Sequence, residues 1–150
     1  TGLTLWFPSA YRVAKVDSNF VWIRRDIETG SVNLFVSKYN DKYNSSIVKI
    51  GDSISKHHIP GPIENTYMST DLIYTPNSQQ INIGGKEIIE TRGLWEIQGQ
   101  FMAGPFLNYQ FKSDTTKEEY IMLDGFVYSP GSSKREYVFE LEAIMRTIKD

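Results

Sequence analysis

Apolar residues at the spacing of β-strands dominate the first third of the chain. Residues 20–27 are apolar on both faces, which predicts an internal strand, and residues 31–39 alternate apolar with polar positions. The loop between these runs ends in Gly30, and glycine supplies the left-handed conformation that such hairpin loops use. The pattern therefore predicts a β-hairpin. Residues 3–7 are also expected to be extended, and residues 11–16 have a mixed pattern within this β-rich third.

A second hairpin is predicted at Gly84-Gly85, because both turn positions tolerate positive φ without a Cβ penalty. The long strand after it, up to Ile97, has two distinguishable faces. We expect the face with Trp95 to be buried and the face with Glu90 and Glu96 to be largely hydrated. Further strands are predicted at residues 66–69, 81–83, 106–112 and 119–128.

Two segments change to the 3.6-residue period of an α-helix. Residues 45–57 are predicted to form a middle helix, which ends before the prolines of Ile59-Pro60-Gly61-Pro62. The C-terminal helix is indicated by the capping-box spacing of Ser133 and Glu136, in which each side chain accepts a hydrogen bond from the other residue's amide. Its apolar residues form one stripe that should pack on the sheet: Tyr137, Leu141, Ile144, Met145 and Ile148.

The elements together predict one α+β domain that spans residues 1–150. Its main part is an antiparallel β-sheet, with the middle helix and the C-terminal amphipathic helix packed on it. A chain of 150 residues buries about 70% of the surface that its unfolded form exposes, which suits a single core.

Composition narrows the possible partners. The formal net charge is −2, so no positive field gathers the phosphates of nucleic acid. No apolar run approaches the roughly 20 residues that a transmembrane helix needs. The chain has no Cys, which excludes disulfides and thiol nucleophiles. Because it does not begin with Met, we expect a processed chain or a fragment of a longer protein.

No catalytic constellation is recognisable in the sequence. His57-His58 is the one histidine cluster, and adjacent side chains diverge in regular structure, so we expect no metal site there. We expect no nucleotide cofactor, because no Gly-rich phosphate loop is present, and no nucleophilic catalysis, because no nucleophile elbow is present. An enzyme is the less favoured interpretation. It would be a hydrolase that uses carboxylates around Asp124 or Glu90, which could form a pair in space.

Lys134 and Arg135 stand at the start of the predicted C-terminal helix, where cations oppose the helix dipole by roughly 0.3–1 kcal/mol. An exposed site tolerates this cost, which is the favoured interpretation. Alternatively, an anion docks on the free amide groups of the helix start. The pair is therefore a candidate contact for a small anionic ligand, together with Arg12 or Arg92.

An apolar stretch at residues 100–106 is the best candidate for a contact surface. A Gly-Pro pair lies within it, where the chain should turn. Large apolar side chains in a loop are covered either by the core, which is favoured, or by a partner. We expect this surface where the stretch approaches residues 60–62 and 93–95. Its candidate residues are Trp95, Phe101, Met102, Pro105 and Phe106.

Seven motifs, in their order and spacing, carry a family resemblance. They are Phe7-Pro8-Ser9-Ala10-Tyr11-Arg12-Val13-Ala14, Asn19-Phe20-Val21-Trp22-Ile23-Arg24, Ile59-Pro60-Gly61-Pro62, Arg92-Gly93-Leu94-Trp95, Met102-Ala103-Gly104-Pro105-Phe106, Asp124-Gly125-Phe126-Val127-Tyr128-Ser129-Pro130 and Lys134-Arg135-Glu136-Tyr137. Nearly the whole chain resembles the C-terminal part of the Bacteroidetes lipoproteins grouped as domain of unknown function family 4837.

The resemblance implies the C-terminal part of a longer exported protein of the cell envelope, periplasmic or anchored to the outer membrane by an N-terminal lipid. It implies no activity and assigns no catalytic residue. The order of elements is also similar to the α/β/α sandwich of Mog1/PsbP-type proteins, with a ferredoxin-like arrangement as the alternative. The leading hypothesis is a non-catalytic binding or scaffold module with an unknown protein or glycan partner in the envelope.

Overall fold

The computed structural model of the chain describes residues 3–28, 30–40, 68–70, 76–97, 103–113, 119–129 and 134–149, with the backbone alone at 40 and 68–70. The elements are β1 (Arg12–Asp17), β2 (Phe20–Ile27), β3 (Gly30–Asn40), β4 (Met68–Thr70), β5 (Asn77–Ile83), β6 (Lys86–Ile97), β7 (Ala103–Lys112), β8 (Glu119–Tyr128) and α2 (Arg135–Met145). The middle helix predicted at residues 45–57 lies outside the described residues.

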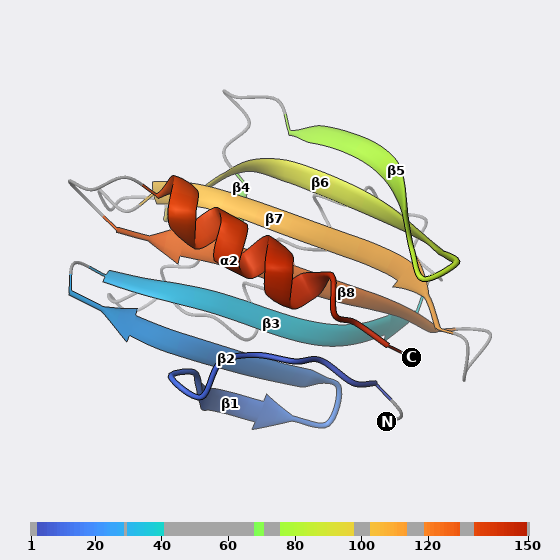
Figure 1. Ribbon diagram of the computed structural model, residues 1–150, viewed down its shortest axis with the longest axis horizontal. Coiled ribbons are helices and arrows are strands. Elements are labelled where there is room, and N and C mark those ends of the chain that lie inside the picture. Colours follow the sequence, from blue (N-terminus) through green and yellow to red (C-terminus); the bar gives the residue numbers. More distant parts are fainter. Residues whose placement is uncertain are drawn as a thin grey trace.

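The eight described strands belong to one sheet, and every described strand pair is antiparallel. The order across the sheet is β1-β2-β3-β8-β7-β6-β4, and β5 pairs with another part of β6. Helix α2 lies across one face of the sheet, over β7, β8 and β3 (Figure 1). This arrangement confirms the predicted α+β class. The finer likenesses to the Mog1/PsbP sandwich and to a ferredoxin-like fold remain predictions.

Both predicted hairpins are present, with one difference in the first. Ile27 pairs with Gly30, so the loop has two residues and Gly30 is the first residue of β3. Glycine is required there because a Cβ atom would overlap the carbonyl oxygen of Tyr128 on β8, not because the loop needs a left-handed residue. In the second hairpin, Gly84 and Gly85 have φ of 59° and 86°, as predicted for this turn.

The first core lies between the sheet and α2. Leu141, Ile144 and Met145 of the helix are buried, and so is Ile148 just beyond it, which confirms the predicted apolar stripe. The sheet contributes Val32, Leu34, Ile88, Leu107, Tyr109, Phe111, Ile121, Leu123 and Val127 to this core.

Helix α2 begins one residue later than the capping-box spacing predicts. Its N-cap is Lys134, whose side chain makes no capping hydrogen bond, and Ser133 lies outside the described residues. The predicted pairing required Ser133 itself as the N-cap, so the expectation was wrong in register by one residue. A shift of this size is common at helix ends, where the first turn lacks intrahelical partners.

The opposite face of the sheet carries a second apolar cluster. It consists of Phe20, Phe35, Trp95, Ile97, Phe106, Met122 and Phe126. The indole N–H of Trp95 donates to the carbonyl oxygen of Val127 at 3.1 Å, and its ring meets that of Phe126 edge-on, 5.8 Å between centroids. Apolar clusters on both faces explain why internal strands such as β2 carry apolar residues on both sides.

Strand β6 departs from its predicted division into a buried and a hydrated face. Ile88 and Glu90, on the face expected to be hydrated, are 0% and 2% exposed, because they lie on the side that α2 covers. Ile89, on the face expected to be buried, is 42% exposed. The alternation along a strand defines two faces, but it does not say which of them a distant helix covers.

Residues 3–7 form no strand, contrary to the prediction. Thr4 makes an isolated bridge with Lys149, through hydrogen bonds of 2.7 and 2.9 Å. Leu3 and Leu5 pack against the first core, while Trp6 remains exposed. Partly buried and exposed side chains thus alternate, as in an extended segment. The segment, however, pairs with Lys149 after α2 and forms no strand of the sheet.

Candidate functional site

The predicted contact surface lies where β6 and β7 pair. Residues 103–106 are paired with residues 93–96, so the expected approach to the Gly93-Leu94-Trp95 segment is confirmed, but through strand pairing and not through a loop. Trp95 and Phe106 are 3% and 8% exposed, and Pro105 is half-buried. The rest of the proposed surface, Phe101, Met102 and Pro60-Gly61-Pro62, lies outside the described residues. A contact role for this surface remains a prediction.

Lys134 and Arg135 lie at the N-terminal end of α2, where the sequence placed them. Neither of the two arginines expected to join them is paired there. Arg12 forms an ion pair at the β1–β2 edge. Arg92 pairs with Glu142 at 3.2 Å, and Glu142 lies about 10 Å along the helix from Arg135. The first turn of α2 therefore presents these two cations without the additional arginines.

The carboxylates Glu90 and Asp124 lie on opposite faces of the sheet. Glu90 is paired with Tyr109 and Asp124 with Asn108, and consecutive residues of β7 face opposite sides. The Asp124 carboxylate accepts a hydrogen bond from the side-chain amide of Asn108 at 2.8 Å. This pair lies on the face of the sheet that carries the second apolar cluster. The two carboxylates that the hydrolase hypothesis would pair do not meet.

Glu90 is an ionised structural anchor beneath α2. Its Oε1 accepts hydrogen bonds from Gln79 and Arg92, each at 3.0 Å. Burial acts to raise the pKa of Glu90, but the hydrogen bonds from Arg92 and Gln79 and the charge of Arg92 together hold this pKa below its usual value. Arg92 also reaches Glu142 of α2. A general acid needs a raised pKa, so the geometry of Glu90 is that of a structural ion pair.

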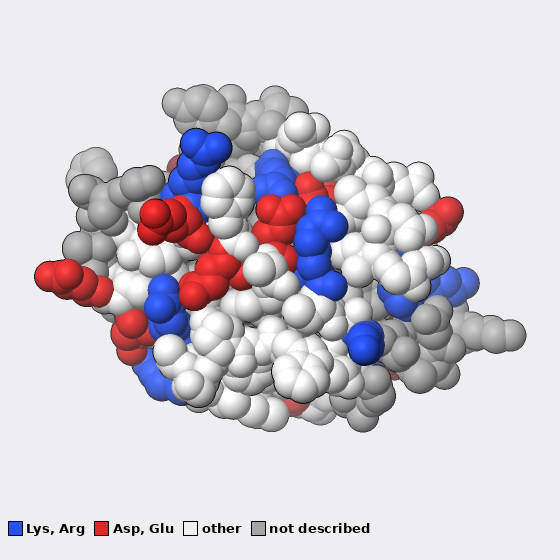
Figure 2. Space-filling model, in the orientation of Figure 1, with Lys and Arg blue, Asp and Glu red and all other residues white. Residues whose placement is uncertain are grey.

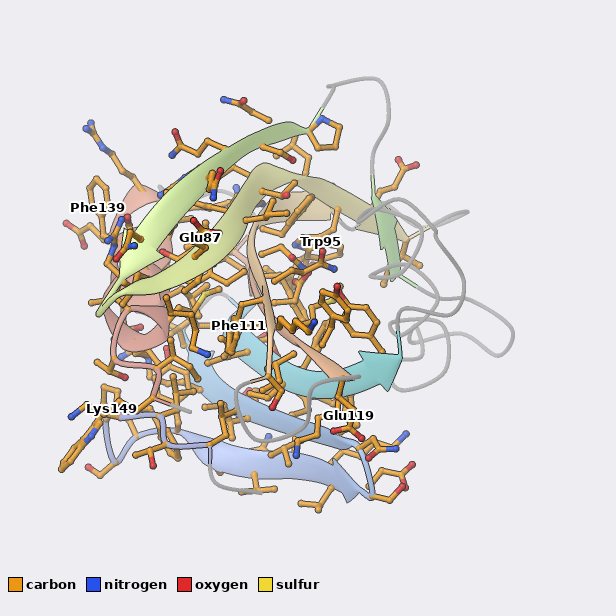
Figure 3. The ribbon with its side chains drawn as sticks, turned by 90° about the vertical axis from the view of Figure 1, so that its right-hand side faces the viewer. Glu87, Trp95, Phe111, Glu119, Phe139 and Lys149 are labelled. Atoms are coloured by element: carbon orange, nitrogen blue, oxygen red, sulfur yellow. The ribbon has the colours of Figure 1, made fainter. Side chains whose placement is uncertain are left out.

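A pocket of about 1090 Å³ opens between the β5–β6 turn, the end of β7 and the residues that follow α2. These segments lie at one end of the molecule in Figure 1. Figure 3 faces that end, with Glu87 above Phe111 and Lys149 below it. We call this space the cationic pocket because of the charged residues that line it among the described ones: the cations Lys86, Lys112, Arg146 and Lys149, and the carboxylate Glu87.

The four cations converge although the chain as a whole has a net charge of −2. In Figure 2 acidic and basic side chains lie side by side over α2, and basic side chains predominate at the right-hand end. Cations that line a concave surface focus the local potential and raise the concentration of anions there. The pocket is therefore suited to a negatively charged group.

Some of these cations also have structural roles. Arg146 pairs with Glu142 one turn earlier at 3.2 Å, and a cation beyond a helix C-terminus complements the helix dipole. The ammonium group of Lys86 lies 4.9 Å from the ring centroid of Phe111. The helix dipole does not explain Lys86 and Lys112, because these come from separate strands. Their convergence with the cations beyond α2 is what distinguishes the pocket.

Trp6 stands at the rim of the cationic pocket with an exposed indole. The side chain is 70% exposed, while its backbone N–H donates to the Thr147 hydroxyl at 2.9 Å. Thr147 in turn donates to the carbonyl oxygen of Ile144 at 2.6 Å. The main chain of Trp6 is thus fixed to the turn after α2, and the ring is free to stack on a flat group.

The described part of the chain defines an α+β domain with an open cationic pocket and an exposed aromatic ring at its rim. The chain belongs to the family described as Domain of unknown function (DUF4837), whose model matches residues 1–147. This match confirms the domain family that the seven motifs indicated, while the resemblance to Bacteroidetes lipoproteins remains a prediction. No curated protein matches the chain.

Two further features bear on the predicted partners. No helix among the described residues is long and apolar enough to cross a membrane. The described ranges also contain no group of three or more His, Asp or Glu side chains placed to hold a metal ion. His57-His58, for which we expected no metal site, lies outside these ranges.

Sequence reasoning does not identify the cationic pocket. Its four cations come from three places in the chain, and each of them stands beside a turn or an element end, where an isolated cation is ordinary. The weak signal is Trp6: in an alternating segment it is a large aromatic residue on the face opposite to Leu3 and Leu5.

Proposed function

We propose that this domain is a non-catalytic binding module that takes an anionic ligand in the cationic pocket. The observation that supports it is the convergence of Lys86, Lys112, Arg146 and Lys149 on one open space of about 1090 Å³. Pockets for small ligands are typically about 300–1,000 Å³, so the space suits a ligand of that class or the charged end of a larger one.

The exposed indole of Trp6 narrows the class of ligand. A ring that lies beside cations favours a ligand with both a flat or weakly polar face and a negative group. Sugars that carry a phosphate or a carboxylate have this combination. Of the two partner classes expected from the sequence, protein and glycan, the pocket therefore favours an anionic glycan.

We also propose that the domain works in the cell envelope, within a lipid-anchored protein. The support is the resemblance to envelope lipoproteins over nearly the whole chain. The test is to fractionate cells that produce the natural full-length protein and to label its lipid. Recovery in the cytoplasmic fraction without label would contradict this location, and it would leave the proposal about the pocket intact.

The experiment that tests the pocket is a titration followed by tryptophan fluorescence and by calorimetry. The probes are inorganic phosphate, glucose 6-phosphate, glucuronate and neutral glucose. The double variant Lys112→Glu with Lys149→Glu should weaken binding of the charged probes by about fivefold or more, because each exposed charge contact contributes up to about 1 kcal/mol. Neutral glucose should bind much more weakly than the charged probes.

The matched control is Lys134→Glu, which reverses a charge at the alternative anion site. Full affinity in this variant, with reduced affinity in the double variant, supports the cationic pocket. If Lys134→Glu alone abolishes binding, the start of α2 is the anion site and the pocket proposal is wrong. Absence of binding to every charged probe at low salt also contradicts it.

A further inference from the structure

Strand β1 is the outermost strand at one end of the sheet. No described strand pairs with its outer edge, which is the lower edge in Figure 1. Such an edge presents backbone donors and acceptors that can pair with another chain. Two apolar side chains on β1 are largely exposed, Val13 at 56% and Val16 at 67%.

A bulge in β1 places these two valines on the same face. Val13 is paired with Ile23 and Val16 with Val21, with a register shift between Val13 and Lys15. Val21 and Ile23 are two residues apart on β2, so they share a face. Residues three apart on a regular strand would face opposite sides, and the extra residue of the bulge removes this conflict.

Arg12 and Asp17 lie on the other face of β1, at its two ends. Their partners on β2 are Arg24 and Phe20, an even number of residues apart. The Arg12 side chain is 59% exposed and donates to Asp26 at 3.1 Å. A guanidinium has five N–H donors, so Arg12 can bind a second carboxylate without losing the first.

We propose that β1 pairs antiparallel with β1 of a second copy of this chain, about a two-fold axis between Ala14 and Lys15. Directly opposed pairs in that register are Arg12 with Asp17, Val13 with Val16, and Ala14 with Lys15, and each occurs twice. The bulge puts both members of the first two pairs on matching faces. Opposite charges and β-branched apolar residues directly across two strands stabilise such a pairing.

The second copy is favoured over an unrelated strand because the complementarity lies within β1 itself. A two-fold interface uses the same patch on both subunits, and β1 presents opposite charges and equal valines at symmetric distances from its centre. An apolar groove of about 400 Å³ adjoins it on the α2 face, with Val16, Val21 and the partly exposed Phe7 in its lining. The Val13–Val16 pairs would extend this apolar surface across the axis.

The dimer is expected to be weak and dependent on concentration, because one six-residue strand buries less area than a standard interface. Analytical ultracentrifugation over a range of concentration should show an increase from the monomer toward twice its mass. Arg12→Asp and Asp17→Arg, each alone, place like charges opposite each other twice and should raise the dissociation constant about tenfold. The double variant restores opposite charges and should dimerise like the natural sequence.

Crosslinking tests the register directly, since the chain has no cysteine. Val13→Cys mixed with Val16→Cys should form an intermolecular disulfide, because directly opposed Cβ atoms lie within about 5.5 Å. Either variant alone should crosslink much less. Val21→Cys, on the neighbouring strand β2, is the matched control and should not crosslink with Val13→Cys.

Thermal melts of all variants show whether the monomer folds, which matters because Arg12 also binds Asp26. Asp17→Arg disrupts the same charge pairs and leaves the ion pair between Arg12 and Asp26 intact. Glu28→Arg, in the exposed turn after β2, should leave the dimer unchanged.

A natural chain that stays monomeric at all concentrations overturns the proposal. So does a dimer that persists in both single charge variants, or one in which Val13→Cys and Val16→Cys do not crosslink.

Discussion

Glu90 shows why a carboxylate among other charged residues in a strand can be buried. The sequence around it alternates charge in a way that is typical of a hydrated face, yet its side chain is 2% exposed. Arg92 and Gln79 satisfy one carboxylate oxygen, and Arg92 connects the group to Glu142 of α2. A buried charge is tolerated when it is paired and hydrogen-bonded, and here the pairing joins β6 to the helix.

The lowered pKa of Glu90 makes its contribution to stability dependent on pH. Because the folded pKa lies below the unfolded value, this contribution is complete above the unfolded value of about 4.3 and is lost as the pH falls through the folded pKa. Glu90→Gln should lower the unfolding free energy by roughly 1–3 kcal/mol at pH 7. Urea unfolding of both proteins at several pH values measures the difference, which should shrink on acidification.

Glu136→Gln is the control, because this carboxylate is exposed in the first turn of α2. Its unfolding free energy should stay within about 0.5 kcal/mol of the natural value. If the difference caused by Glu90→Gln were the same at every pH, Glu90 would not be the titrating group.

Helix α2 is the element whose burial the sequence determines most clearly. Its stripe repeats at helical spacing, and Leu141 at its centre is 1% exposed. Leu141→Ala should therefore lower the unfolding free energy by about 2–5 kcal/mol, since it leaves a cavity over Gly125. Denaturant unfolding is the measurement. Phe139→Ala, at a 53% exposed position of the same helix, should cost much less; equal losses would contradict the predicted orientation of α2.

The strands show how far local pattern determines this fold. Residues 119–128 were predicted with the observed bounds of β8, because this run is rich in aromatic and β-branched residues, which favour a strand. The buried face of β6 was predicted correctly at Thr91, Trp95 and Ile97. The face predicted to be hydrated is partly buried, because the helix that covers Ile88 comes from the other end of the chain. Residues 3–7 have a strand-like pattern, but the pairing partner of Thr4 is the single residue Lys149. Local pattern indicates which residues are extended, not what they pair with.

The cationic pocket and the β1 edge illustrate the same limit at the candidate sites. Lys112 and Lys149 are unremarkable in the sequence and acquire meaning only when the sheet and the turn after α2 bring them together. The self-complementary faces of β1 depend on a bulge between Val13 and Lys15, which strict alternation does not predict. Both sites form only when separate segments of the chain pair or pack together, so the pattern within any one segment does not indicate them.

At the scale of the whole molecule, the two ends of the described chain hold the pocket together. The Thr4–Lys149 bridge fixes a cation of the pocket, and the hydrogen bond from Trp6 to Thr147 fixes its aromatic rim. These contacts join residues more than 140 positions apart, so they are made only when the sheet and α2 are already assembled. The site is thus a product of the complete fold.

Thr147→Val tests this link, because valine keeps the shape of threonine and removes the hydroxyl that binds the Trp6 amide. We expect a loss of about 0.5–1.5 kcal/mol in the unfolding free energy. Without this hydrogen bond Trp6 is no longer fixed at the rim, so the pocket should bind glucose 6-phosphate more weakly. Its affinity for inorganic phosphate, which does not stack on a ring, should not change. Thr147→Ser retains the hydroxyl and should behave like the natural chain in both assays. An equal loss of affinity for both probes in Thr147→Val would show that the hydroxyl supports the cations and not the aromatic rim.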